Sequence, residues 1–343
     1  MQLQFVAPGL ARRWPDLDAL SAADVDRHAP RFRGGINDWI VQTYLLLKDS
    51  LAECGLHATI GETFARNAIN LAHRDSLNRL FVPYHRSYIV GVRADRPPLH
   101  LCRWQIVQND LGSARPHTRY LPMWPQPGLI ERDPARGTRI ESIVYFGRAG
   151  AAPAWFYDAR FHAALARLGV TFRVSEAQWF DYSNVDLVLA YRTEALTLLR
   201  HKPASKLANA WRAGTPALLA DEPAYASLRR SPLDYLSIGS PADVLAAVRD
   251  LRASPARYQA MVANGLRRAS EFSRDVNRAR WLEFLAADVL PDATCWARER
   301  SALVDGWGAQ LTALARQKLA TKRFKRRVRV ELRTQAAAMQ SHG

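Results

Sequence analysis

The second half of the chain alternates short apolar runs with helical patterns of about 10–15 residues, and this alternation limits the fold more than any other feature of the sequence. The apolar runs predict strands at Ile143–Phe146, Val170–Val174, Val185–Ala190, Pro216–Ala220 and Tyr235–Ile238. Strands joined by helices of this length form a mainly parallel sheet with helices on both faces. The sequence therefore predicts an α/β fold.

The first half of the chain shows the same alternation less regularly. Its predicted elements are a helix at Ile36–Cys54, strands at Ala68–Ala72, Tyr88–Val92, Leu99–Val107 and Arg119–Trp124, and a helical stretch at Ser76–Phe81. Three prolines and two glycines in residues 124–139 mark a linker. We predict two Rossmann-like domains facing a cleft, over residues 1–127 and 128–287, followed by a helical basic tail over residues 288–343.

Composition places the chain among globular proteins. Of its 343 residues, 48% are hydrophobic and 23% are charged, and no apolar run approaches the roughly 20 residues that span a bilayer. The three cysteines, Cys54, Cys102 and Cys295, lie far apart, which argues against a disulfide framework and a cysteine-built zinc site. The amino-terminal residues lack the pattern of a signal peptide. We therefore expect a cytoplasmic protein.

Positive charge is concentrated near the carboxyl terminus. Half of the formal net charge of +16 lies between Arg316 and Arg333, where nine basic residues accompany one acid, Glu331. Apolar residues repeat at helical spacing in the same stretch, at Phe324, Val328 and Leu332. This pattern predicts a basic amphipathic helix that lies on an anionic membrane surface, at the inner face of the cell membrane. The alternatives are a helix packed back on the first domain and a tail that binds nucleic acid.

A short stretch in the second half carries the strongest sign of chemistry. Ser205 is a natural N-cap, so Lys206 is expected in the first turn of a helix, with Asn209 one turn further on the same face. A lysine in that position disfavours the helix but suits a diphosphate, because the free N–H groups and the positive end of the helix also attract the anion. Lys202, four residues before Lys206, adds a second compact ammonium group.

This stretch resembles the nucleotide-sugar-binding half of GT-B glycosyltransferases, which reads Ser-Lys-Leu-x-Glu-(Tyr/Ala)-x-Ala-x-Gly-x-Pro-(Val/Ala). The matching residues are Ser205, Lys206, Leu207, Ala210, Gly214, Pro216 and Ala217. The resemblance implies that Lys206 contacts the donor diphosphate. It also implies that Asn209, which stands where the family has an acid, contacts the ribose. His201 stands where retaining members of the family have a second acid.

Residues at the ends of two predicted strands extend this resemblance, which covers about residues 140–287. Gly147 and Arg148 look like the family's Gly-Arg pair, whose arginine reaches the diphosphate. Glu222 follows the strand at Pro216–Ala220 and is expected at the carboxyl end of the sheet, where open α/β sheets bind ligands. The alternative role for Glu222 is a cap on the next helix.

The first half supplies candidates for the acceptor side. Gly34 and Gly35 let backbone approach a ligand. Asp38, one turn into the following helix, either takes a proton from an acceptor hydroxyl or is only a favourable acid in a first turn. His73 is a second candidate base or an ordinary loop residue. The two Asp-x-Asp pairs before residue 30 follow no apolar strand, so we read them as surface residues and predict no metal site.

The resemblance implies a metal-independent glycosyltransferase of hexosyltransferase type, acting in polysaccharide biosynthesis. It would move a sugar from a nucleotide sugar to a hydroxyl of a glycan or lipid-linked acceptor, with no cofactor beyond the donor itself. Two alternatives remain open: a nucleotide-sugar epimerase of the same fold, and a nucleic-acid-binding protein that acts through the basic tail. Nucleic acid is not expected as a partner, since the sequence has no helix-turn-helix, zinc-finger or aromatic RNA-binding signature outside the tail.

Overall fold

The computed structural model describes residues 1–78, 87–112, 115–299 and 307–340. The chain forms two compact units, each built from several segments. Unit 1 comprises Met1–Trp124, Leu196–Pro203 and Arg274–Gly343, and unit 2 comprises Pro125–Ala195 and Ala204–Ser273. These units group residues 196–203 and 274–343 with the amino-terminal half, which differs from the three consecutive ranges predicted above.

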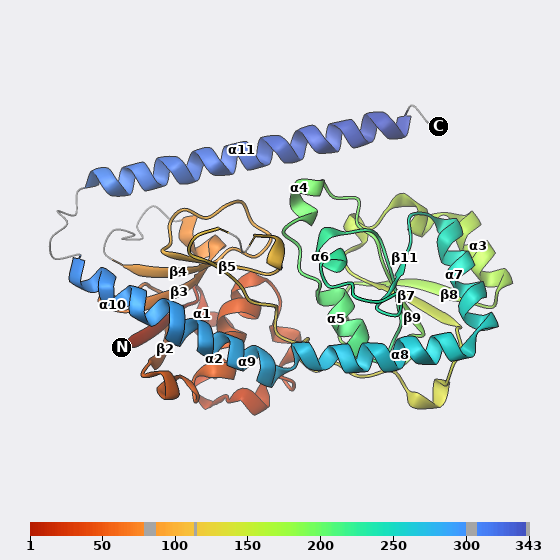
Figure 1. Cartoon of the computed structure of the whole chain (residues 1–343), viewed down its shortest axis with the longest axis horizontal. Coiled ribbons are helices and arrows are strands. Elements are labelled where there is room, and N and C mark those ends of the chain that lie inside the picture. Colours follow the sequence, from red (N-terminus) through yellow and green to blue (C-terminus); the bar gives the residue numbers. More distant parts are fainter. Residues whose placement is uncertain (79–86, 113–114, 300–306, 341–343) are drawn as a thin grey trace. The chain divides into compact units, whose positions relative to one another are not determined.

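Unit 1 contains a six-stranded sheet in which every pair of neighbouring strands is parallel (Figure 1). Its strand order is β2-β1-β3-β4-β5-β6. The strands are β1 (Gln2–Val6), β2 (His57–Gly61), β3 (Ile69–His73), β4 (Tyr88–Val92), β5 (Trp104–Val107) and β6 (Thr118–Tyr120). Residues in β3 and β4 are buried throughout, as expected for parallel strands covered on both faces.

The sequence did not predict β1 and β2, although β1 lies between two strands of the sheet. Gln2 and Gln4 make β1 look polar, yet both side chains bond to Thr59 of the neighbouring β2. Gln2 Nε2 donates to Thr59 Oγ1 over 2.8 Å, and Thr59 Oγ1 donates to Gln4 Oε1 over 2.6 Å. Partners of this kind allow polar side chains to enter a sheet without loss of hydrogen bonds.

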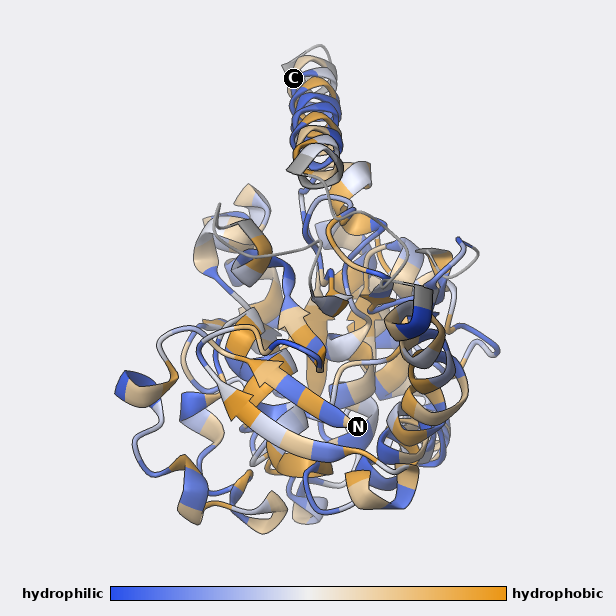
Figure 2. Cartoon of the chain, turned by 90° about the vertical axis from the view of Figure 1, so that its left-hand side faces the viewer, coloured by the Kyte–Doolittle hydropathy of each residue, from blue (hydrophilic) through white to orange (hydrophobic). Residues whose placement is uncertain are grey.

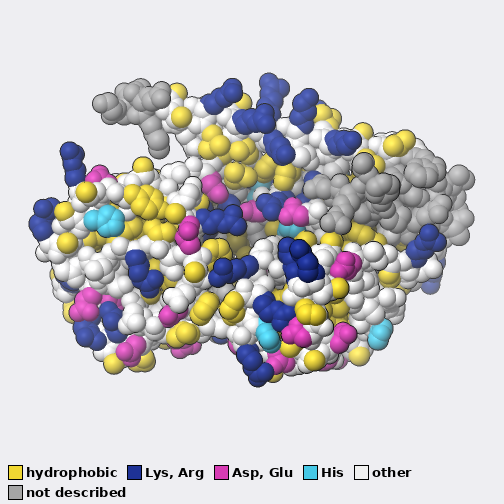
Figure 3. Space-filling model, turned by 180° about the vertical axis from the view of Figure 1, so that it is seen from behind, with side chains coloured by type: hydrophobic (Ala, Val, Ile, Leu, Met, Phe, Trp, Pro, Cys, Tyr) yellow, Lys and Arg dark blue, Asp and Glu magenta, His cyan; other side chains and the backbone are white. Residues whose placement is uncertain are grey.

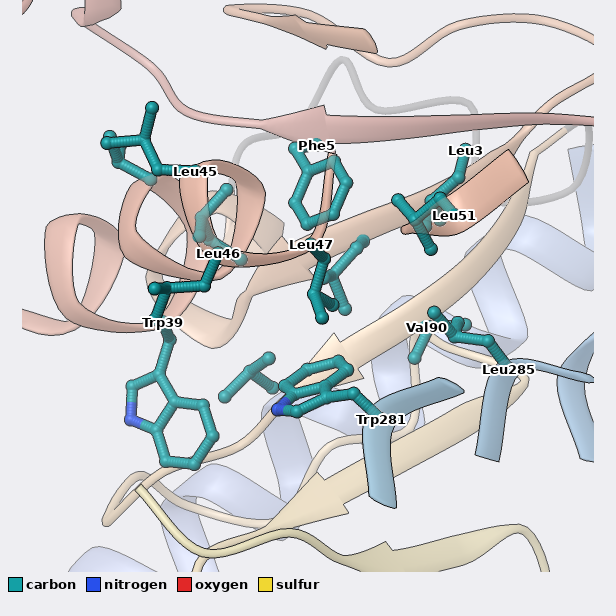
Figure 4. Close-up of a cluster of buried hydrophobic side chains, with 14 of the residues drawn as sticks. Leu3, Phe5, Trp39, Leu45, Leu46, Leu47, Leu51, Val90, Trp281 and Leu285 are labelled. Atoms are coloured by element: carbon teal, nitrogen blue, oxygen red, sulfur yellow. The ribbon is translucent and has the colours of Figure 1, made fainter. Parts of the chain in front are cut away.

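Helices from the amino-terminal and carboxyl-terminal segments of unit 1 complete its core. The predicted helix at Ile36–Cys54 contains a π-helical turn, Asn37–Val41, and continues as α2 (Gln42–Leu47). After a short turn it ends as a 3-10 helix, Leu51–Cys54. Trp281 from α9 (Arg274–Glu283) and Leu285 from the π-helical turn after it belong to the same buried cluster as Leu3, Phe5 and Trp39 (Figure 4). This core therefore joins residues nearly three hundred positions apart in the chain.

Two further predicted elements of unit 1 are shorter than expected. The strand at Leu99–Val107 is confirmed only over β5, and the strand at Arg119–Trp124 only as far as Tyr120. The helical stretch at Ser76–Phe81 begins within a 3-10 helix, Arg74–Asn78, and its last three residues lie outside the described residues. Unit 1 also includes α4 (Leu196–Leu199) and α10 (Leu290–Glu299).

Unit 2 contains a five-stranded parallel sheet in the order β11-β10-β9-β7-β8. Its strands are β7 (Ser142–Phe146), β8 (Thr171–Ser175), β9 (Leu187–Ala190), β10 (Ala217–Leu219) and β11 (Leu236–Ser237). Its main helices are α3 (Ala159–Arg167), α5 (Ser205–Arg212), α6 (Pro223–Ala226), α7 (Pro241–Ala253) and α8 (Pro255–Ala269). All five strands predicted for this half are confirmed.

The tail forms α11 (Trp307–Gln340), so the predicted helix is confirmed. The prediction that its apolar stripe faces a membrane is wrong for Phe324. Phe324 is buried with its ring 5.9 Å from that of His201, and Val328 is half-buried. Gln317 donates to Pro98 O and accepts from His100 N–H. Phe324 therefore packs on unit 1, as the alternative of a helix packed back on the first domain expects, whereas Leu332 at the end of the predicted stripe is 40% exposed. Figure 2 shows hydrophilic and hydrophobic residues alternating along this helix.

No helix among the described residues combines the length and the apolar character that crossing a bilayer requires.

A buried carboxylate ties the predicted linker to unit 2. Asp186 has no exposed surface, and its two oxygens accept from Arg132, from Arg136 and from the N–H groups of Glu141 and Ser142. Burial alone would raise the pKa of Asp186, but hydrogen bonds from Arg136, the Glu141 N–H group and Arg132 outweigh it and lower that pKa. The carboxylate is thus charged in the folded protein and fully partnered.

Removing this carboxylate should destabilise the fold. We expect Asp186→Ala to lower the free energy of unfolding by about 3–5 kcal/mol, because the buried Arg132 guanidinium loses its counter-charge. Denaturant unfolding followed by circular dichroism measures the change. The exposed Asp250→Ala in α7 is the control and should change stability by less than about 0.5 kcal/mol. Equal unfolding midpoints for the two variants would show that Asp186 does not hold the linker in place.

Candidate functional site

The strand order of unit 2 reverses between β7 and β9, which are neighbours in the sheet although β8 lies between them in the sequence. In open parallel sheets, the carboxyl ends of the strands on either side of such a reversal form the usual ligand site. Gly147 and Arg148 follow β7, and Arg192 follows β9. Glu222 follows β10, the next strand on the same side. Three of the predicted donor-site residues therefore share this edge of the sheet.

Lys206 lies in the first turn of α5, as predicted. The N-cap of α5 is Ala204, so the prediction that Ser205 caps the helix is wrong. Ser205 itself is the first helical residue, and among the described residues no N-cap side chain bonds to the first turn. Because no serine hydroxyl takes up these donors, they remain suited to an anion. The Lys206 ammonium lies 5.4 Å from the centre of the Tyr145 ring.

Gly147 is required by the position of Tyr145. A Cβ at Gly147 would lie 2.6 Å from the Tyr145 ring, closer than carbon atoms approach. The absence of a side chain lets the ring of Tyr145 stay next to Lys206, where it attracts the ammonium through its π face. Arg148, the next residue, is exposed. Arg148 thus lies in solvent at the end of β7, and Gly147 leaves room for the Tyr145 ring beside the Lys206 ammonium of α5.

Arg192 and Glu222 form a buried ion pair at the same edge of the sheet. Arg192 was not predicted from the sequence. Both side chains are less than a tenth exposed. Burial raises the pKa of Glu222, while the charges of Arg192 and Lys206 act in the opposite direction. Glu222 occupies the N-cap position of α6, but its side chain does not cap the helix, and Oε1 has no hydrogen-bond partner among the described residues. That oxygen is an acceptor in need of a donor.

The signal that points to Arg192 is positional. It lies two residues beyond β9, as Arg148 lies two residues beyond β7. The same rule that selected Glu222, a polar residue just after a strand of the parallel sheet, selects Arg192 once the end of the strand is known. Its guanidinium lies 5.9 Å from the centre of the Tyr225 ring, which is fully buried.

Asn209 lies one turn after Lys206 and is half-buried. Its side chain faces the buried Tyr182 hydroxyl, and it acts against the rise that burial causes in the pKa of that hydroxyl. An amide has both a donor and an acceptor, so Asn209 can also bond a ligand hydroxyl.

Lys202 belongs to unit 1, whereas Lys206 belongs to unit 2. The Lys202 ammonium lies 2.9 Å from a carboxylate oxygen of Asp95. The backbone around it is also held, since Asn109 Nδ2 donates to the carbonyls of Arg200 and Lys202 over 2.9 Å each. Lys202 is therefore a structural cation of unit 1 in this state, and its role toward the donor stays a prediction.

The acceptor-side candidates also gather at a reversal of strand order, here between β1 and β3. His73 is the last residue of β3 and is almost fully buried. A Cβ at Gly35 would overlap the His73 imidazole, so the glycine lets the loop pass directly over the ring. Gly34 has φ 89°, a conformation that favours glycine. The structure thus brings the glycine pair and His73 together.

The protonation of His73 follows from its surroundings. Burial lowers the pKa of His73 to about 4, so the ring is neutral near pH 7. Nδ1 accepts from the N–H group of Asp75 over 3.2 Å, which places the single proton on Nε2. Nε2 has no hydrogen-bond partner among the described residues. His73 is therefore better arranged to donate a hydrogen bond than to remove a proton at that nitrogen.

Asp38, unlike His73, is suited to accept a proton. It lies in the first turn of the helix after the glycine pair and accepts a hydrogen bond from the Gly34 backbone. Although part of the residue is accessible, burial raises the pKa of the Asp38 carboxyl to about 7. A carboxylate with a pKa near the working pH takes up a proton more readily than an ordinary aspartate does.

The fold has counterparts among solved structures. The chain aligns with Alr3699/HepE from Anabaena, in complex with UDP and glucose, at TM-score 0.51 and 12% identity over 84% of this chain and 100% of that one. It aligns with sucrose-phosphate synthase from Thermosynechococcus elongatus at TM-score 0.50 and 10% identity over 82% and 97% of the two chains. The chain has the GT-B fold.

A further GT-B match has a longer chain. The GtfA/B complex aligns at TM-score 0.43 and 12% identity, over 63% of this chain and 56% of that one. The present chain therefore spans little more than half the length of that relative. No protein-family model and no curated protein sequence matches the chain.

Among the described residues, no group of three or more His, Cys, Asp or Glu side chains is placed to hold a metal ion. The two amino-terminal Asp-x-Asp pairs lie in turns and short 3-10 helices. Asp16 pairs with Arg31 at 2.6 Å, and Asp24 accepts from the backbone N–H group of Ser21. Both carboxylates thus serve local structure in this GT-B protein. Metal independence stays a prediction.

The raised pKa of Asp38 predicts a pH-dependent cost to stability. Between about pH 4 and pH 7 the folded carboxyl holds a proton that the unfolded chain releases, so stability falls as pH rises across this window. We therefore expect Asp38→Asn to become progressively more stable than the native protein from about pH 5 to pH 8. Urea unfolding at a series of pH values measures the difference. The exposed Asp18→Asn is the control and should show no such trend.

If the Asp38→Asn difference is independent of pH, the carboxyl is ionised in the folded protein throughout this range. Its assignment as a poised base would then lose its electrostatic support.

Proposed function

We propose that this protein is a glycosyltransferase that moves a sugar from a nucleotide-sugar donor to a hydroxyl group. The observation that carries the proposal is the edge of the unit 2 sheet, where Lys206, Arg148 and the uncapped start of α5 lie at or beside the reversal of strand order in a GT-B fold. Two cations and free N–H groups at one such edge suit a diphosphate.

The donor half of the reaction needs stabilisation of the leaving group. As the bond from sugar to diphosphate breaks, negative charge builds on the phosphate oxygens, and preorganised cations lower the energy of that state. We assign this role to Lys206 and Arg148. The amide of Asn209 is assigned to the ribose, and Glu222 Oε1, which has no hydrogen-bond partner among the described residues, accepts a bond from a hydroxyl of the nucleotide sugar.

The acceptor half of the reaction needs a group that takes the hydroxyl proton if the anomeric centre inverts. Asp38 is the stronger candidate for this base, since its pKa is raised to about 7 and its carboxylate carries a free lone pair when ionised. His73 is assigned to donating a hydrogen bond from Nε2, close to the Gly34–Gly35 loop.

The finer parts of the proposal are a hexosyl donor, metal independence, and a glycan or lipid-linked acceptor in polysaccharide biosynthesis. UDP-glucose is the first donor to try, and UDP the first nucleotide, because the aligned Anabaena protein is solved with UDP and glucose. An epimerase would share the donor site but convert the nucleotide sugar without an acceptor. Product analysis with and without acceptor glycans therefore separates these two enzymes.

The function is tested by Lys206 variants in a panel of nucleotide sugars. We expect one or more nucleotide sugars to bind and to be turned over, and Lys206→Ala to lower kcat/KM by about 10²-fold, as loss of one preorganised charge does. Lys206→Arg should recover part of the rate, and Arg160→Ala, an exposed cation of unit 2, should leave it unchanged.

Circular dichroism spectra check that all three variants fold. Near-normal turnover by a folded Lys206→Ala protein would remove Lys206 from the mechanism. Failure of every nucleotide and nucleotide sugar to bind, with tight binding of nucleic acid, would favour the alternative of a nucleic-acid-binding protein.

A further inference from the structure

The inward face of α11 is fixed to unit 1 by specific contacts. Gln317 bonds to the backbone on both sides of Leu99, and Phe324 packs on His201. Further along, Glu331 accepts from the N–H group of Thr197 over 2.8 Å and from its hydroxyl over 2.5 Å. One side of α11 is therefore already occupied by the protein itself.

The outward face of α11 is strongly cationic. All nine basic residues of the stretch are exposed: Arg316, Lys318, Lys322, Arg323, Lys325, Arg326, Arg327, Arg329 and Arg333. The single acid of the stretch, Glu331, points inward and accepts hydrogen bonds from Thr197. The fold thus separates the charges, so that the outward face carries nine positive groups and no negative one. Figure 3 shows Lys and Arg side chains along the edge that α11 forms.

Apolar side chains are exposed among these cations. Leu319 is 48% exposed and Val330 is 55% exposed, and they lie eleven residues apart, which is about three helical turns. They therefore share one line on the outward face, between arginines. Long basic side chains can lay their stems beside such residues and extend their charged ends toward headgroups.

We propose that the outward face of α11 docks on an anionic lipid bilayer. A long straight helix with cations on its outer side and apolar residues between them suits a flat surface of lipid phosphates, with Leu319 and Val330 at the acyl boundary. Nucleic acid is less well matched, because between Arg316 and Arg333 this face has no aromatic side chain to stack on bases and no exposed Asn or Gln to read them.

This inference does not depend on the glycosyltransferase proposal, and it replaces the apolar stripe predicted from the sequence. The surface that meets the membrane is the one opposite Phe324. A lipid-linked acceptor would make the location useful, since docking would concentrate the enzyme where the acceptor is.

Vesicle flotation with the full chain tests the inference. We expect the protein to float with phosphatidylcholine vesicles that contain about one third phosphatidylglycerol, and not with phosphatidylcholine alone, at about 0.1 M salt. A tail variant carries Arg323→Gln, Arg326→Gln, Arg327→Gln and Arg329→Gln. A matched variant carries Arg160→Gln, Arg167→Gln, Arg249→Gln and Arg257→Gln on exposed positions of unit 2.

Both variants lose the same charge, so only the position of the charge differs. The tail variant should lose at least about tenfold in partitioning to anionic vesicles, and the matched variant should keep it. Leu319→Ser with Val330→Ser should also weaken binding. Equal losses in the two arginine variants, or no preference for anionic vesicles, would overturn the inference. Salt-sensitive binding to oligonucleotides without vesicle binding would overturn it in favour of nucleic acid.

Discussion

Parallel hydrogen bonding between neighbouring strands is the constraint on which both candidate sites depend. A parallel sheet collects the carboxyl ends of all its strands at one edge, and in each sheet of this protein the strand order reverses once. At the reversal, the loops that follow two neighbouring strands turn to opposite faces and leave room for a ligand. His73 lies at this place in unit 1, and Gly147 lies at it in unit 2.

Burial then gives the residues at these edges properties that they would not have in water. Asp38 gains a pKa of about 7, His73 stays neutral, and Glu222 is held beside Arg192 in surroundings that strengthen every charge interaction. A buried ion pair is weak evidence for stability, because desolvation offsets most of the attraction. Its place beside Lys206 makes a role in binding the better explanation.

The sequence predicted the unit 2 sheet well because β7, β9 and β10 are almost entirely apolar and because α7 and α8 are long. It missed β1 because the glutamines there are satisfied only by a threonine more than fifty residues away. It also placed the outer side of α11 wrongly, since a helical repeat shows which residues share a face but not what that face meets. Glu331 and Phe324 reveal the direction only through their contacts with Thr197 and His201.

The candidate site was predictable to a similar degree. Lys206, Arg148 and Glu222 follow from motif and strand ends, whereas Arg192 needed the observed end of β9. Lys202 shows the limit of spacing as an argument. It lies four residues from Lys206, yet the backbone passes from unit 1 to unit 2 between them, and Asp95 takes up its charge.

The central claim is that unit 2 binds the nucleotide sugar at the carboxyl edge of its sheet. Hydrogen–deuterium exchange of the full chain, with and without the nucleotide sugar that binds, tests it most directly. The account predicts slower exchange at residues 147–149, at the start of α5 over 204–208, and around Glu222. Binding that protects other segments and leaves these three unchanged would contradict it.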